Sequence, residues 1–190
     1  MPRSIIDEPL KKMDLMLVRT STQFQQMRDS LNDPHSVAAR QIVMAEYGLA
    51  SEMAQSLETE CGTLLLTFAI RGFSSGSITD EHRGLFREAE AAVQKMTLGA
   101  LLFRIKKTMP FTLLPWATID DAKDKRNYLA HHFFRFHNFA VYSESGRSGM
   151  VMELVDMRTR FHNARSAVSD AITALEAHCT CGGIDFGGAH

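Results

Sequence analysis

Arg126 and His131 bring two residue types that act on phosphate esters into one hexapeptide. A guanidinium is always charged and binds phosphate oxygens through forked hydrogen bonds. An imidazole exchanges a proton close to neutral pH. The spacing therefore suggests a phosphate clamp beside a proton shuttle, provided that one element carries both ends of it.

The element expected to carry these residues is a helix from about Ile119 to about Tyr142. Because an α-helix advances about 100° per residue, its side chains divide into two faces. The face expected to pack in the core holds Leu129, Phe133, Phe136 and Ala140. The opposite face holds Asn127, His131, Phe134 and Asn138. A phenylalanine among polar side chains is typical of an interface, so we expect Phe134 and Asn138 to meet a partner and His131 to point away from the core.

The basic residues gather in the middle of the chain. Residues 95–147 carry 9 Lys and Arg against 4 Asp and Glu, a net charge of +5, whereas the whole chain has a net charge of −1. The asymmetry indicates either a solvated basic face or a phosphate-binding surface. Lys106 and Lys107 carry the same two alternatives, because cations at a helix C-terminus are also favoured by the helix dipole.

Composition and length favour one globular domain. The chain has 190 residues, of which 45% are hydrophobic and 23% charged, enough to bury a core. The run Leu64–Ile70 is too short to cross a membrane and the start lacks a signal-peptide pattern, so we expect no membrane partner. Three cysteines are an odd number for a disulfide framework, which favours a reducing, cytoplasmic location.

Good helix formers dominate, and no segment alternates as a strand would. We expect an all-α bundle of about five to six helices, with a single domain over residues 1–178 and a flexible Gly-rich tail over 179–190. The first two expected helices are 9–31 and one of about 35 residues from Pro34 capped by Asp33. The next two are one opened by Thr79 and running to about Lys95 and one opened by Thr97 over 98–107, and the last two are 119–142 and 150–178. Thr118 with Asp121 forms the expected capping box of the fifth, and Ser145–Gly149 the turn before the last.

The hexapeptide Arg126-Asn127-Tyr128-Leu129-Ala130-His131 resembles the R-x4–6-H signature of HEPN domains, in which an asparagine often follows the arginine. His132, Phe133 and Phe134 after it, and the runs Cys61–Leu65 and Met96–Leu102 before it, extend the similarity to a group of bacterial HEPN-like proteins. It spans roughly Gln41 to Leu175. The hexapeptide is its one specific motif.

The resemblance implies an all-α bundle that forms a homodimer, with the motif helices of both copies meeting in a composite site. Many HEPN proteins are metal-independent endoribonucleases of toxin–antitoxin, CRISPR and antiphage systems. His131 would then be the general acid or base for attack of a ribose 2′-hydroxyl, Arg126 the phosphate ligand and Asn127 an orienting group. RNA would be the substrate, an antitoxin a further partner, and no cofactor is needed.

A non-catalytic HEPN-like dimer that binds RNA or a protein is the alternative, with Arg126 and His131 holding the interface. In either case further RNA contacts are expected from His132, Arg135, Lys106 and Lys107. No metal site is expected, because the adjacent His131 and His132 point about 100° apart on a helix. The Cys179-x-Cys181 pair also lacks the spacing of zinc sites.

Overall fold

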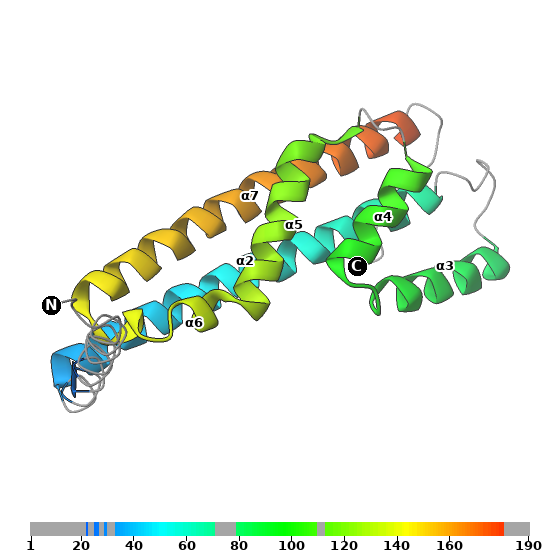
Figure 1. The fold of residues 1–190 in the computed structure, drawn as a ribbon. Coiled ribbons are helices and arrows are strands. Elements are labelled where there is room, and N and C mark those ends of the chain that lie inside the picture. The colour runs from blue at the N-terminus through cyan, green and yellow to red at the C-terminus, as the bar shows by residue number, and fades with distance from the viewer. Residues whose placement is uncertain are drawn as a thin grey trace, which may run out of the picture. The chain divides into compact units, whose positions relative to one another are not determined.

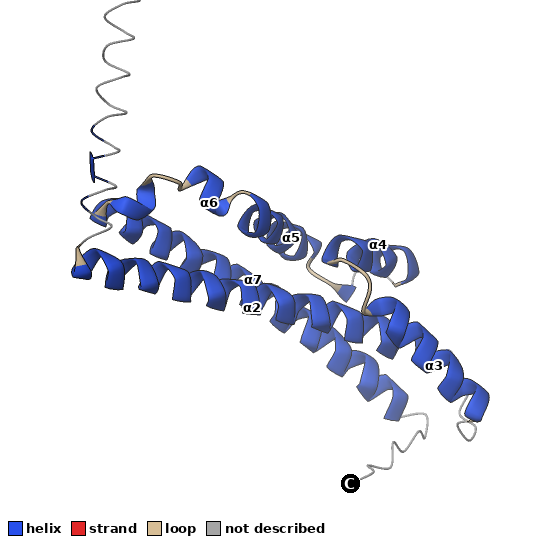
Figure 2. Ribbon diagram, turned by 90° about the horizontal axis from the view of Figure 1, so that it is seen from below, coloured by secondary structure: helices blue, strands red, loops and turns tan. Residues whose placement is uncertain are grey.

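The computed structural model describes residues 22, 25, 26, 29, 33–70, 79–109 and 113–180. Within these ranges every regular element is helical (Figure 2), so the all-α prediction is confirmed. The elements are α2 (Pro34–Ile70), α3 (Asp80–Val93), α4 (Leu98–Thr108), α5 (Trp116–His131), α6 (Phe133–Phe136), the 3-10 turn η2 (Ala140–Tyr142) and α7 (Glu144–Thr180) (Figure 1). Most of the helix expected over 9–31 and the tail beyond Thr180 lie outside the described residues. None of the described helices is long and apolar enough to cross a membrane.

The described chain divides into two compact units. The first contains the described residues up to Gly48 together with His131–Val155, and the second those within Leu49–Ala130 and Asp156–His190. Buried side chains of the first unit include Val43, Phe133, Met150 and Leu154. Those of the second include Leu57, Cys61, Leu64, Leu101, Ile105, Ile119, Met157 and Phe161. A single domain over 1–178 stays a prediction.

The predicted starts of the first three described helices are confirmed. At α2, the Asp33 carboxylate accepts hydrogen bonds from the backbone N–H of His35 and Ser36 at 3.2 and 2.9 Å. The hydroxyls of Thr79 and Thr97 cap α3 and α4 in the same way. Such caps satisfy backbone donors that the first turn leaves unbonded, so they are readable from local sequence.

The prediction of one helix over 119–142 is wrong. Helix α5 ends at His131, His132 leaves the α region at φ −127°, ψ −25°, and the short α6 and η2 follow. Residues 131–139 are almost wholly His, Phe and Asn, which are weak helix formers. The break changes the helical phase, so Phe136, expected in the core, is 70% exposed.

The start of α5 also differs from the prediction, because Thr118 lies inside the helix and does not cap it. The carbonyl of Pro115 accepts the backbone N–H groups of Thr118 and Ile119 at 2.9 and 3.2 Å. The helix begins immediately afterwards at Trp116. Proline cannot donate a backbone hydrogen bond, which suits a position just before the first turn.

The turn predicted at Ser145–Gly149 is instead the first part of α7. The Ser143 hydroxyl accepts the Gly146 N–H at 3.1 Å and so caps the helix six residues before the predicted start. A Cβ at Gly146 would lie only 2.1 Å from the carbonyl oxygen of Ala140. This glycine therefore marks a close approach of two backbone segments, which sequence alone does not separate from a turn.

Candidate functional site

Arg126 and His131 both lie on α5 (Trp116–His131), as predicted. Trp116, Ile119, Ala122 and Leu129 are its buried residues. Four buried positions along 16 residues hold the helix in place. The phosphate clamp and the proton shuttle suggested by the sequence thus have a common helical support, and each side chain has its own surroundings.

Arg126 is engaged with a carboxylate. Its Nη2 lies 3.3 Å from Oε2 of Glu58, which is on α2. The side chains of Arg126 and Glu58 are 28% and 24% exposed, so water screens this ion pair less than it would a fully exposed one. Glu58 balances the charge of the guanidinium and fixes it against α2, whereas the sequence suggested a guanidinium available to phosphate.

Glu58 also shares its surroundings with other groups that the sequence reasoning missed. It lines a cavity of about 320 Å³ between α2, α3 and α4, whose lining also includes Glu90. The lining is close-packed at Gly62, where a Cβ would lie 2.8 Å from Cγ1 of Val93. Cys61 lies one turn after Glu58. Burial, together with the charges of Glu58 and Glu60, raises the pKa of its thiol from 9.0 to about 12. Sixty-eight residues separate Glu58 from Arg126, so no local spacing indicates their pairing.

His131 is the last residue of α5 and is exposed. The ring of His132, also exposed, lies 6.4 Å away at an interplanar angle of 75°. The His132 ring in turn lies 6.1 Å from that of Phe136. The two adjacent histidines therefore present imidazoles to solvent at the point where the helix ends.

The other predicted site residues differ in how exposed their side chains are. Asn127 on α5, Arg135 on α6 and Asn138 in the following turn are exposed. Phe134 was expected to be exposed, but it is half-buried, with its ring centroid 4.8 Å from that of Tyr47. Part of its apolar surface is already covered by α2, which removes one reason for assigning it to an interface with a second copy.

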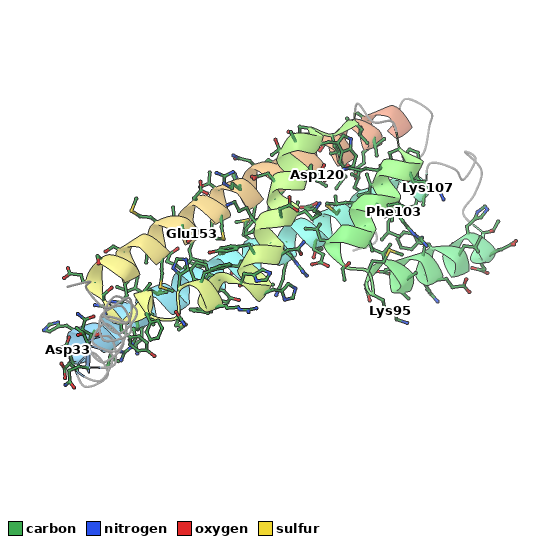
Figure 3. The ribbon with its side chains drawn as sticks, in the orientation of Figure 1. Asp33, Lys95, Phe103, Lys107, Asp120 and Glu153 are labelled. Atoms are coloured by element: carbon green, nitrogen blue, oxygen red, sulfur yellow. The ribbon has the colours of Figure 1, made fainter. Side chains whose placement is uncertain are left out.

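Lys106 and Lys107 separate into two different roles. Lys106 Nζ lies 2.8 Å from Asp120 on α5 and 4.6 Å from the centroid of the Trp116 ring, so it ties α4 to α5 through an ion pair and a cation–π contact. Lys107 is exposed and projects from α4 (Figure 3). Of the two cations, Lys107 is the one whose exposed side chain suits a ligand.

The histidine after α6 has a partner that the helical wheel did not indicate. His137 Nε2 lies 2.7 Å from Oε2 of Glu153 on α7, and the two side chains are 22% and 32% exposed. The Phe133 ring centroid lies 4.7 Å from that of His137. This contact pins the segment after the helix break, so His137 has a structural explanation within its own unit.

In the part of the chain that the structure describes, no group of three or more His, Cys, Asp or Glu side chains could hold a metal ion. Comparison of the chain with protein-family models, with curated proteins and with solved structures finds no match. The residues of α5 and their surroundings are therefore the features that bear on function.

Proposed function

We propose that this protein is a metal-independent endoribonuclease of the HEPN type, active as a homodimer in a cytoplasmic toxin or antiphage role, with an antitoxin as a further partner. The observation that carries the proposal is the exposed imidazole of His131, which ends the same helix that carries the anchored guanidinium of Arg126. A buried, internally satisfied histidine would have argued against catalysis. Exposure is what a group that exchanges protons with a substrate needs.

The chemistry needs one base, one acid and one charge-stabilising group. His131 takes the proton of a ribose 2′-hydroxyl, and the 2′-oxygen attacks the adjacent phosphorus. The bond to the 5′-oxygen breaks as the protonated His131, now acting as the acid, gives that proton to the leaving oxygen. The products carry a 2′,3′-cyclic phosphate and a 5′-hydroxyl. Arg126 stabilises the charge on the phosphate oxygens, as fixed cations do in phosphoryl chemistry, and Asn127 orients the reacting groups.

The direct test compares His131→Ala with His132→Ala, because both histidines are exposed and adjacent. Positioned acid–base catalysis contributes about 10²–10⁴-fold, so His131→Ala should lower the cleavage rate by that factor. His132→Ala should retain most of the wild-type rate at saturating RNA, because a lost RNA contact raises the KM and leaves the proton transfer in place. Cleavage of labelled mixed RNA, with end-group analysis, measures both. EDTA should leave the rate unchanged; a wild type that leaves RNA intact, or equal rates for the two variants, contradicts the proposal.

A second candidate function, a non-catalytic HEPN-like module that binds RNA or a protein, is favoured by one specific observation. Arg126 is paired with Glu58 at 3.3 Å, which gives the arginine a structural role without any substrate. In that role the two residues act as a unit, and their effects on stability are strongly non-additive.

A double-mutant cycle distinguishes the two candidates. If Arg126 only holds α5 to α2, Arg126→Gln, Glu58→Gln and the double variant should lose similar stability in urea, and none should change RNA cleavage. If Arg126 binds phosphate, Arg126→Gln should abolish cleavage, whereas Glu58→Gln should retain it and lower the KM for RNA. Glu58→Gln removes the competing negative charge and keeps the size of the side chain.

A further inference from the structure

The exposed face of α4 combines an aromatic ring with cations. Phe103 is 69% exposed, although Leu101, Leu102 and Ile105 around it in sequence are buried. At about 100° per residue, Phe103 lies opposite the buried side of the helix, with Lys107 one turn later on the same face. Both project from α4 in Figure 3. Single exposed apolar side chains are common on protein surfaces, so the ring indicates a ligand only together with the cations beside it.

The flanks of the Phe103 ring are open. One turn before it stand Gly99 and Ala100, both exposed, and a Cβ at Gly99 would meet no atom within 4 Å. Helical side chains lean toward the N-terminus of the helix, so the ring lies over these two small residues. A planar group that approaches the ring from this end of α4 therefore meets no long side chain at Gly99 or Ala100.

The charged side chains of α4 itself have one sign. The sequence of α4 contains Arg104, Lys106 and Lys107 and no acidic residue. Lys106 is paired with Asp120, which leaves Arg104 and Lys107 as exposed cations. Both lie on the same side of Phe103, about 100° and 40° around the helix axis from it. The preceding helix α3, by contrast, carries four acidic residues against two arginines. The basic charge is thus local to α4.

We propose that this face of α4, made by Phe103, Arg104 and Lys107, binds single-stranded RNA. One base stacks on the Phe103 ring while the two cations bind the phosphates beside it. The combination of a stacking ring with flanking cations is how sequence-tolerant single-strand sites work. The inference rests on the proposed function for its choice of RNA and adds where the strand is held. A second copy of the chain fits this face less well, because pairing two α4 faces would bring four cations together.

The test is binding of a fluorescent oligouridylate of about 12 nucleotides, measured by anisotropy with the full chain in a His131→Ala background that prevents cleavage. Phe103→Ala should weaken binding by roughly 5- to 150-fold, the loss expected from one stacked base. Phe103→Trp should restore it and Phe103→Leu should not. Phe136→Ala, which removes an equally exposed ring from α6, is the matched control and should bind normally.

Salt dependence tests the cations separately. Arg104→Ala and Lys107→Ala should each reduce the slope of log K against log salt by about 0.7, as expected for one lost phosphate contact on a single strand. Arg87→Ala, which removes an exposed cation from the acidic helix α3, should leave the slope unchanged. A matched RNA duplex should bind more weakly than the single strand, because its bases are not free to stack.

Equal affinities for Phe103→Ala and Phe136→Ala would overturn the inference. A dimeric wild type and a monomeric Phe103→Ala variant would also overturn it, because the face would then belong to the contact with a second copy. Because binding is measured without cleavage, the two proposals fail separately. A chain that binds through α4 but never cuts RNA contradicts the nuclease alone, and one that cuts RNA with unchanged affinity in Phe103→Ala contradicts the α4 site alone.

Discussion

At the level of single residues, Arg126 and His131 differ in how far their side chains are committed to contacts within the chain. Arg126 is 28% exposed and held at 3.3 Å by Glu58, whereas His131 is exposed at a helix end. A group that transfers protons needs access, and a group that only supplies charge needs a fixed position. Under the proposed function, His131 would therefore exchange protons and Arg126 would supply charge, and a phosphate would have to compete with Glu58 for the guanidinium.

The neighbouring Cys61 gives a prediction about reactivity. Burial, with the charges of Glu58 and Glu60, raises the pKa of its thiol to about 12, so the thiolate that reacts with alkylating agents is scarce at neutral pH. In a Cys179→Ser, Cys181→Ser background, Cys61 should resist iodoacetamide at pH 8 in the folded chain. It should react at once in urea, and mass spectrometry after a timed exposure measures both. Equal labelling in the two conditions would place the thiol in solvent.

The same thiol makes stability depend on pH in one direction. Its pKa is higher in the folded chain than the ordinary 9.0, so above about pH 9 the unfolded chain releases a proton that the folded chain keeps. The contribution of Cys61 is complete below pH 9 and is lost as pH rises toward 12. The free energy of unfolding in urea should therefore fall more steeply between pH 8 and about pH 10 in the wild type than in Cys61→Ala. Parallel slopes would contradict the assigned burial.

At the level of elements, the sequence predicted three helix caps made by local hydrogen bonds. It missed the equally local cap of Ser143 on α7 and the contacts between distant residues. The caps at Asp33, Thr79 and Thr97 are made within three residues and were predicted. The end of α5 at His131 was not, because the low helix propensity that follows it takes effect only with the packing of Phe133, which is fully buried. Propensity is a weak prior that tertiary contacts override.

In the candidate site, too, some features follow from local sequence and others depend on contacts between helices. Its helix and the placement of Arg126 and His131 on it follow from local sequence, and the exposure of Asn127 follows from helical spacing. The partners Glu58 of Arg126 and Glu153 of His137 come from other helices. Side-chain pairs between helices depend on how the helices pack, which one sequence does not encode in any spacing. The exposed Phe103 is a different case, because helical spacing within 98–107 already places it opposite the buried Leu101 and Ile105.

Two glycines of α7 give a matched prediction at this level. A Cβ at Gly146 would lie 2.1 Å from the Ala140 carbonyl oxygen, whereas a Cβ at Gly149 would meet no atom within 4 Å. Gly149→Ala should stabilise the chain by about 0.5–1 kcal/mol, the helix-propensity gain. Gly146→Ala should destabilise it by about 2 kcal/mol, because backbone on both sides has to move. Urea denaturation of the two variants should give shifts of opposite sign; shifts of the same sign would contradict the close contact at Gly146.

At the level of the whole molecule, the proposed enzyme is a homodimer whose site needs two copies of the motif. A composite site makes activity a property of the dimer. A variant that still dimerises but does not catalyse therefore inactivates the wild-type subunit with which it pairs. A site complete within one chain is indifferent to such a variant. The two arrangements therefore give different rates in a mixture, even where they give the same rate in pure protein.

The measurement is RNA cleavage at a constant wild-type concentration, with His131→Ala added in about tenfold excess under saturating RNA. If both copies of His131 are needed, random pairing leaves roughly one wild-type chain in eleven with a wild-type partner, and the rate should fall by about that factor. Saturating RNA removes competition between the chains for substrate. An excess of Arg126→Gln should lower the wild-type rate in the same way. An unchanged rate, with size-exclusion chromatography showing that the chains exchange partners, would mean that each chain carries a complete site and would contradict the composite arrangement while leaving the chemistry assigned to His131 intact.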